Sequence, residues 1–243
     1  MDPRLAVIPF RLGGVKRIIV VCSGKGGVGK TLISTLFALL ASQRGKRVGL
    51  LDLDFHGPSV SVVLGCRGCT PLEDKGLIPV EVAGVKVMSL DFFAGSAPLP
   101  LRGRDATEAL IELLAVTRWG ELDLLVVDSP PGTGDELLDA VRLLKGVEAL
   151  VVTTPSKLAL SSVSRLVGLL KAARVPVLGV LENMRVEDDV NVQRMAAEWG
   201  LVYLGWLPYD RDLERALGDP SALFSTSVSR SLERILETAN LLA

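Results

Sequence analysis

A nine-residue segment near the start of the chain has the composition and spacing of a site that holds phosphate. In its sequence, SGKGGVGKT at residues 23–31, four residues separate Gly24 from the run Gly29, Lys30 and Thr31. Glycines let successive backbone N–H groups point at one phosphate chain, the lysine would reach the β- and γ-phosphates, and the threonine hydroxyl would bind Mg²⁺. This is the Walker A pattern. The residues predicted to contact nucleotide are Gly24, Lys25, Gly26, Gly27, Val28, Gly29, Lys30, Thr31 and Leu32.

Lys25 is a second lysine in the same loop, and a mononucleotide site does not require it. Backbone amides and Lys30 already meet the charge of the bound phosphates. A further cation could cancel the charge that develops while the γ-phosphate is transferred, as an arginine finger does. Supplied across an interface, it would make hydrolysis depend on dimerisation. The alternative is a lysine that is only solvated.

Three aspartates follow apolar runs and could complete a magnesium site. Asp128 ends the run LLVV at 124–127, a hydrophobic strand followed by an acid as in a Walker B motif. A carboxylate at that position can hold the Mg²⁺ shell. Asp52 and Asp54 are two residues apart, so in an extended chain they share one face. We predict that Thr31, Asp52 and Asp128 contact Mg²⁺ and that Asp54 positions the attacking water.

Apolar runs and helical patterns alternate in the way a parallel sheet requires. The run RIIVVC at 17–22 precedes the loop, and a stretch of good helix formers at 32–43 follows it. Further strands are predicted at 47–51, 77–82, 85–90, 122–127, 149–153, 177–181 and 201–206, and further helices at 104–118, 135–145, 157–173 and 190–199. Apolar strands alternating with helices predict an α/β fold with a mostly parallel central sheet and helices on both faces. Ligands bind at the carboxyl ends of such strands.

The properties of the whole chain restrict its class. Its 243 residues are 49% hydrophobic, and its net charge of −1 offers no electrostatic case for binding nucleic acid or an anionic membrane. No run reaches membrane-spanning length and no signal-peptide pattern begins the chain, so we predict a cytoplasmic protein. We predict one domain over 1–243, with an N-terminal extension at 1–14 and an amphipathic C-terminal helix, within 221–243, packed on the domain.

Segments outside the loop carry a resemblance to a known family. The loop itself looks like the deviant Walker A motif of the MinD/ParA class of P-loop NTPases. The segments DLDFHGPS at 52–59, DSPPGTGD at 128–135 and VLGVLENM at 177–184 resemble those of the Mrp-type (ApbC-like) iron–sulfur cluster carrier ATPases. The similarity runs from about residue 15 to the C-terminus.

This resemblance implies a homodimeric ATPase that binds ATP or ADP with Mg²⁺ and acts in iron–sulfur cluster assembly or transfer. It implies that Lys25 reaches the ATP of the partner subunit and that Asp54 positions water. Asn183 would hydrogen-bond adenine, and the segment that holds Pro208 and Asp210 would help to wall the base. A [4Fe–4S] cluster shared across the dimer, and client or scaffold proteins, are the further cofactor and partners implied.

The cysteines depart from the pattern of that family. A Cys-x-x-Cys pair usually follows Glu-Asn-Met and bridges a cluster between subunits, but residues 185–189 contain no cysteine. Cys66 and Cys69 form such a pair elsewhere. Two thiolates are half of a tetrahedral zinc or cluster site, which a dimer could complete. The alternatives are a disulfide between the two cysteines and a pair that has no metal role. Cys22, inside an apolar run, is expected to be core.

Two other classes compete with a cluster carrier. One is a MinD/ParA-like positioning or regulatory switch without a cluster, and members with membrane roles usually end in a basic amphipathic helix. The tail here mixes Arg230 and Arg234 with Glu233 and Glu237, which favours packing on the chain's own domain. The other is a nucleotide-binding scaffold that does not hydrolyse its ligand.

Overall fold

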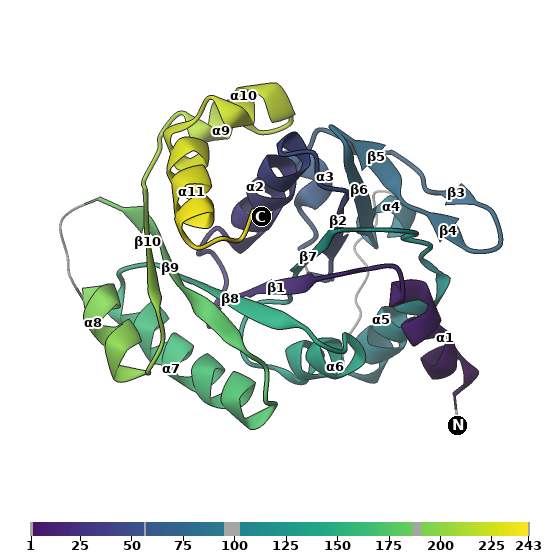
Figure 1. Ribbon diagram of the computed structural model, residues 1–243, viewed down its shortest axis with the longest axis horizontal. Coiled ribbons are helices and arrows are strands. Elements are labelled where there is room, and N and C mark those ends of the chain that lie inside the picture. Colours follow the sequence, from purple (N-terminus) through teal and green to yellow (C-terminus); the bar gives the residue numbers. More distant parts are fainter. Residues whose placement is uncertain (1, 56, 95–102, 187–190, 243) are drawn as a thin grey trace.

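One eight-stranded sheet organises the part of the chain that the computed structural model describes, residues 2–55, 57–94, 103–186 and 191–242 (Figure 1). The strand order is β10-β9-β8-β1-β7-β2-β6-β5, and neighbouring strands are parallel except for the pair β5 and β6. The strands are β1 Ile18–Cys22, β2 Val48–Asp52, β5 Val80–Val82, β6 Val85–Ser89, β7 Leu124–Asp128, β8 Glu148–Thr153, β9 Val177–Arg185 and β10 Tyr203–Pro208. The predicted α/β class with a mostly parallel sheet is confirmed.

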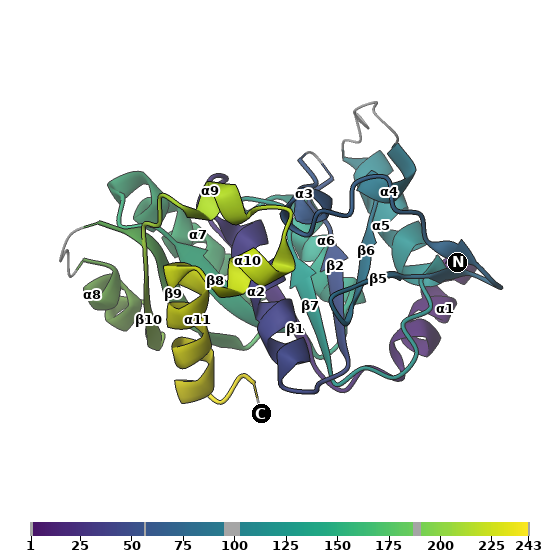
Figure 2. The ribbon, with the colours of Figure 1, turned by 90° about the horizontal axis from the view of Figure 1, so that it is seen from above.

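Helices cover both faces of this sheet (Figure 2). The apolar core against one face draws on α1 Pro3–Leu12, α5 Arg104–Val116, α6 Asp135–Leu143, α7 Lys157–Ala172 and α8 Asn191–Glu198. The core against the other face draws on α2 Lys30–Gln43, α3 Val60–Val63, α9 Leu213–Ala216, α10 Pro220–Phe224 and α11 Ser227–Thr238. The remaining elements are α4 Asp91–Ala94 and the short hairpin β3 Leu72–Glu73 and β4 Leu77–Ile78.

Local sequence explains where the site-forming elements begin. β1, β2 and β7 are buried at every position, which is why they are apolar without alternation. α2 begins directly after Gly29, whose left-handed backbone turns the chain from loop to helix. α7 begins after Ser156, whose hydroxyl accepts a hydrogen bond from the Ala159 N–H. The sequence therefore places the phosphate loop between a buried strand and a buried helix.

Several predicted strands have other bounds in the structure; β9, for example, extends to Arg185, four residues beyond its predicted end at 181. Residues 80–82 do pair with β6 across the turn at Ala83 and Gly84, but Leu77–Ile78 pairs with β3 instead. Pro79 separates the two segments, and its missing N–H interrupts a ladder. The last strand is β10, two residues later than predicted at each end. β10 lies at one edge of the sheet and pairs with a neighbour on one side only. The bounds of such a strand depend less on its pattern of apolar residues.

Both ends of the described chain pack on the sheet layers. α1 lies on α5 with Ile8 buried, and Arg4 forms ion pairs with Glu108 and Glu112. α11 packs on α2 and β10 through its buried apolar face, Val228, Leu232 and Leu236. Within the described residues, no helix combines the length and apolar character needed to cross a membrane.

Candidate nucleotide site

The predicted phosphate loop forms one wall of a pocket of about 420 Å³ at the carboxyl end of the sheet. The loop contributes Gly26 through Leu32, which is most of the predicted set, and Asp54 lies on the lining as well. The pocket is completed by Ser23 of the loop segment and by Ser59 and Pro131, which lie in the segments at 52–59 and 128–135. The sequence analysis did not single out the remaining lining residues, which carry no motif of their own: Val62, Val63, Leu213, Glu214 and Leu217.

Asp128 is the centre of a buried polar cluster behind this pocket. Its carboxylate is fully buried at the end of β7 and accepts hydrogen bonds from the Lys30 ammonium (2.7 Å) and the Thr31 hydroxyl (2.6 Å). The Ser34 hydroxyl lies 2.9 Å from the same carboxylate. Ser34 was missed by the sequence analysis, although it lies one helical turn after Lys30 and so on the same face of α2. Lys30 itself is only 6% exposed, so the ion pair is shielded from water.

Asp52 lies beside Asp128, because the two residues are paired in register across β2 and β7. The Asp52 carboxylate accepts hydrogen bonds from the Asp54 N–H (3.0 Å) and the Ser89 hydroxyl (3.2 Å). Burial, and then the nearby negative charge of Asp128, raise the pKa of Asp52 to about 8. A cation placed beside this buried carboxyl would be strongly stabilised by the negative charge of the two aspartates.

Asp52 and Asp54 do not share one face of an extended strand, as their spacing suggested. β2 ends at Asp52, and the chain turns back so that the Asp54 N–H reaches the Asp52 carboxylate. The turn still directs Asp54 to the pocket, where one carboxylate oxygen lies 4.0 Å from the Lys30 ammonium and the other accepts from the Gly57 N–H. The side chain is 16% exposed and can contact water in the pocket.

The raised pKa of Asp52 predicts a pH dependence of stability in the nucleotide-free protein. The folded state binds this proton more tightly than the unfolded chain, so the free energy of unfolding should fall as pH rises from near 4 to about 8. Asp52→Asn should remove at least about 1 kcal/mol of that fall, since one pKa unit corresponds to about 1.4 kcal/mol. Denaturant unfolding of both proteins at pH 5 and pH 8 measures the difference. Equal slopes for the two proteins would contradict the assignment.

Asn183 lies against the phosphate loop and is almost fully buried at the end of β9. Its side-chain amide donates a hydrogen bond of 2.8 Å to the carbonyl of Val28. A Cβ added at Gly29 would lie 2.4 Å from that amide nitrogen, so the space beside the loop is already filled. In this structure Asn183 holds the loop backbone, and its contact with adenine stays a prediction.

Replacing Gly29 by alanine should therefore disturb the loop more than its backbone angle alone requires. Gly27 and Gly29 have similar left-handed φ values of +77° and +82°, but the space beside Gly27 is open. Gly27→Ala should cost only the strain of a left-handed alanine, about 1–2 kcal/mol. Gly29→Ala should cost about 1 kcal/mol more, because it also displaces the Asn183 hydrogen bond. Urea unfolding compares the two variants, and equal losses of stability would argue against the Asn183 contact.

Gly24, near the start of the loop, packs against α7. A Cβ at Gly24 would lie 2.5 Å from the backbone carbon of Ser162, so only glycine fits between the loop and this helix. Lys25 follows and is partly exposed, with its carbonyl accepting from the Ser23 hydroxyl at 2.9 Å. Among the described residues, its ammonium group has no hydrogen bond or ion pair. The side chain is thus available to a group outside this chain.

The predicted wall for the base lies further from the loop. Pro208 ends β10, paired with Arg185 of β9. The Asp210 carboxylate accepts hydrogen bonds from the Ser227 N–H and hydroxyl at the start of α11, and these bonds keep its pKa below the ordinary value. The base contacts of Pro208 and Asp210 stay predictions, because the pocket lining on this side comes from α9 and the residue after it.

The cysteine pair lies in the turn that follows α3. All three thiols of the chain are free, and Cys22 is buried in β1 as expected. Cys66 is 4% exposed, whereas Cys69 is partly exposed. Burial, followed by the neighbouring Cys69, raises the pKa of Cys66 to about 11. The described residues contain no group of three or more His, Cys, Asp or Glu side chains arranged to hold a metal ion.

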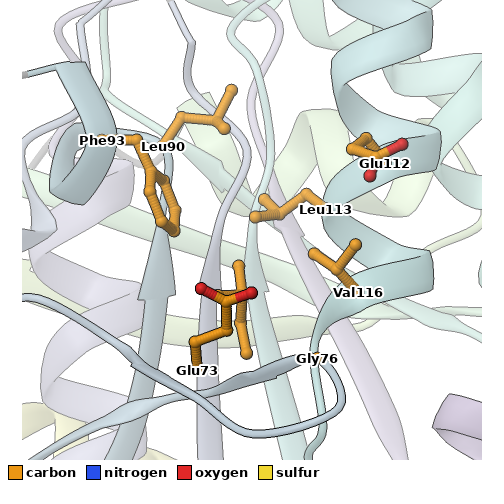
Figure 3. A pocket seen from close by; sticks show the side chains of 8 residues that line it. Glu73, Gly76, Leu90, Phe93, Glu112, Leu113 and Val116 are labelled. Carbon is orange, nitrogen blue, oxygen red and sulfur yellow. The ribbon is translucent and has the colours of Figure 1, made fainter.

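A second cavity, of about 530 Å³, lies away from the phosphate loop between the β3–β4 hairpin, α4 and α5 (Figure 3). Leu90, Phe93, Leu113 and Val116 line it, and the carboxylate of Glu73 points toward the same space. Although larger, this cavity is apolar and bordered by acidic groups, which would repel phosphate. The pocket at the loop is therefore the candidate nucleotide site.

The geometry of the loop agrees with a comparison of the chain with protein-family models. Residues 14–240 match the model described as "ParA: NUBPL iron-transfer P-loop NTPase". The chain belongs to this family. The residues that match this family model include the phosphate loop, the Asp128 cluster and Asn183. The site described above therefore lies wholly within the matched range.

Relatives of known name support the same family. An iron–sulfur cluster carrier protein of Aquifex aeolicus is 40% identical over 219 residues, which are 84% of this chain and 60% of that relative. A nucleotide-binding protein of Archaeoglobus fulgidus, solved in complex with ADP, is 32% identical with a TM-score of 0.76, covering 91% of this chain and 93% of that one. The MinD cell division ATPase of Pyrococcus furiosus shares the fold, with a TM-score of 0.69 at 24% identity, covering 93% and 99% of the two chains.

Proposed function

We propose that this protein is a homodimeric, Mg²⁺-dependent ATPase that acts in the cytoplasm in the assembly or transfer of iron–sulfur clusters. The observation that carries the ATPase is the Asp128 cluster, because it joins Lys30 and Thr31 of the loop to a strand-ending carboxylate. Membership of the NUBPL/ParA family and the name of the Aquifex aeolicus relative support the cluster role. The single sheet with both faces covered supports one domain over the chain.

The oxygen donors at the site suit a magnesium ion. Thr31, Asp52 and Asp128 offer a hydroxyl and two carboxylates, which are the hard ligands that Mg²⁺ prefers. The raised pKa of Asp52 is a second sign of fit, because a nearby cation would relieve the repulsion between the two buried carboxylates. When bound, Mg²⁺ would neutralise charge on the β- and γ-phosphates.

The side chains of this chain would share the remaining work of hydrolysis. Lys30 would exchange its bond to Asp128 for the phosphates. Asp54, at the pocket lining and partly exposed, would hold the attacking water by a hydrogen bond. Lys25 would act on the nucleotide of the partner subunit, which is consistent with an ammonium group that has no partner among the described residues.

The cluster, as cargo, would be bound by thiolates. The sequence contains three cysteines, and Cys22 is inaccessible inside β1, so ligation by cysteine falls to Cys66 and Cys69. Cys69 is the accessible member of the pair, and Cys66 would need a change in its loop to face a second subunit. Client or scaffold proteins would supply the remaining ligands during transfer.

Two measurements test the proposal and separate its parts. Single-turnover ATP hydrolysis with Mg²⁺ should be weak but measurable in the wild type and at least about 100-fold slower in Asp54→Ala, within the range expected for a water-positioning group. Anaerobic cluster reconstitution of the ATP-loaded protein should give a bound cluster that Cys66→Ser/Cys69→Ser loses and Cys22→Ser keeps. Hydrolysis without any bound cluster would reject the carrier role and leave an ATPase. Equal hydrolysis by wild type and Asp54→Ala would reject the catalytic assignment.

A further inference from the structure

The turn that carries Cys66 and Cys69 brings their two thiols together within one chain. The Cys69 N–H donates to the Cys66 carbonyl at 3.1 Å, and Gly68 between them has φ of +77°, as the third position of a type II turn requires. Such a turn keeps its first and last Cα atoms within about 7 Å, which overlaps the range of about 4.4–6.8 Å found across disulfides. The Cys69 side chain is close enough to Cys66 to contribute to the raised pKa of its thiol.

The surroundings of the pair, as the structure shows them, suit chemistry inside one chain. Cys66 is packed in the apolar core with α2 and α3 and is 4% exposed, while Cys69 rests against the same core and is partly exposed. A metal or cluster held by both thiols of two subunits would need both sulfurs at the surface. Within the described residues, no third His, Cys, Asp or Glu side chain joins the pair.

We propose that Cys66 and Cys69 form an oxidisable dithiol that closes to an intrachain disulfide when it meets a low-molecular-weight disulfide. This inference concerns the same two cysteines as the proposed cluster role, but its test needs neither ATP hydrolysis nor a bound cluster. Its closure would leave no thiolate at the pair for a metal or cluster.

The reaction follows from the exposure of the two thiols. The sulfur of Cys69, as its thiolate, attacks the small disulfide, breaks its S–S bond and forms a mixed disulfide, releasing one small thiolate. The Cys66 thiol then loses its proton, and its sulfur attacks the Cys69 sulfur and expels the second small thiolate. The released thiolates take up the two protons. The two protein thiols lose two electrons in total, and the small disulfide gains them.

The site adjoins the nucleotide pocket. Val62 and Val63 of α3 line that pocket, and Cys66 follows three residues later with its N–H bonded to the Ser61 carbonyl at 2.9 Å. The Val63 carbonyl accepts from the Gly218 N–H at 3.0 Å, next to the pocket residue Leu217. The cysteine turn is therefore bonded to α3, which forms one wall of the pocket, and α3 is bonded to the segment after α9, which forms another. The oxidation state of the pair can be compared in nucleotide-free and nucleotide-bound protein.

Thiol counting on the full chain tests the proposal. The reduced protein is incubated with oxidised glutathione, unfolded, alkylated with N-ethylmaleimide and weighed by mass spectrometry. We expect loss of two of the three alkylated thiols, a mass lower by two hydrogens before alkylation, and a peptide map that links Cys66 to Cys69. Cys22→Ser should behave in the same way with one thiol fewer. Cys66→Ser should stop at one bound glutathione on Cys69.

Three outcomes would overturn the proposal. They are retention of all three thiols, a wild-type protein that stops at the mixed disulfide, and a disulfide that joins two copies of the chain. The peptide map is made on the wild type, so the result does not depend on whether Cys66→Ser folds normally. Repeating the incubation on a dilute sample separates the intrachain product, whose yield is independent of protein concentration, from a product between chains.

Discussion

Asp128→Ala is expected to lower the free energy of unfolding by about 3–5 kcal/mol, the range for removing one partner of a buried ion pair. The physical reason is the environment of Lys30, whose ammonium group is 6% exposed and would lose its 2.7 Å bond to a carboxylate. The Thr31 hydroxyl would lose its acceptor at 2.6 Å as well. Urea unfolding of the nucleotide-free protein is the measurement. The variant should also be inactive in ATP hydrolysis.

The chain offers a matched control for this loss. Asp123 also accepts from two basic side chains, Lys16 and Arg47, but in a partly exposed ion-pair cluster. Asp123→Ala should therefore cost much less stability than Asp128→Ala. A Lys30→Met/Asp128→Leu double variant removes both buried charges and should be more stable than Asp128→Ala alone. Similar losses for Asp123→Ala and Asp128→Ala would contradict the role of burial.

Lys25→Ala is expected to reduce ATP hydrolysis by about 10³-fold, the lower end of the effect of a charge supplied to the transferred phosphate across an interface. Its free energy of unfolding should change by less than about 0.5 kcal/mol, because the side chain is partly exposed and has no polar partner among the described residues. Lys145→Ala, at an exposed lysine before β8, is the control and should leave both quantities unchanged. Single-turnover hydrolysis and urea unfolding provide the two readouts.

Mixing two inactive variants tests whether Lys25 acts on its own nucleotide or on that of the partner subunit. In a mixed dimer of Lys25→Ala and Asp54→Ala, action across the interface would leave one of the two sites with both side chains intact. Activity should then return on mixing, although each variant alone is inactive. If the mixture stays inactive while the subunits demonstrably exchange, Lys25 does not act across a dimer.

The sequence alone determined the parts of the site that depend on neighbouring residues. Glycine spacing predicts that the loop backbone binds phosphate, and apolar strands alternating with helices predict a mostly parallel sheet. Asp52, Asp54 and Asp128 were identified because polar residues that end apolar strands gather at one edge of such a sheet. Helical spacing of apolar residues also predicts a C-terminal helix, and in α11 the residues Val228, Leu232 and Leu236 are buried.

Only the tertiary structure decided which polar groups bond to each other. β1 lies between β7 and β8, and this strand order brings Asp128 to Lys30 although 98 residues separate them. Asn183 meets Val28 across 155 residues, and neither residue carries a local signal for that bond. Asp210 bonds to Ser227 at the start of α11, a contact that depends on where α11 packs.

Burial was the other property that the sequence did not reveal. Spacing made Cys66 and Cys69 equal members of a pair, but packing against α2 and α3 encloses Cys66 and leaves Cys69 partly exposed. The same process raises the pKa of Asp52, because folding removes water from it and places Asp128 beside it. Motifs depend on short stretches of backbone, whereas solvent access and long-range partners arise only when distant segments pack together.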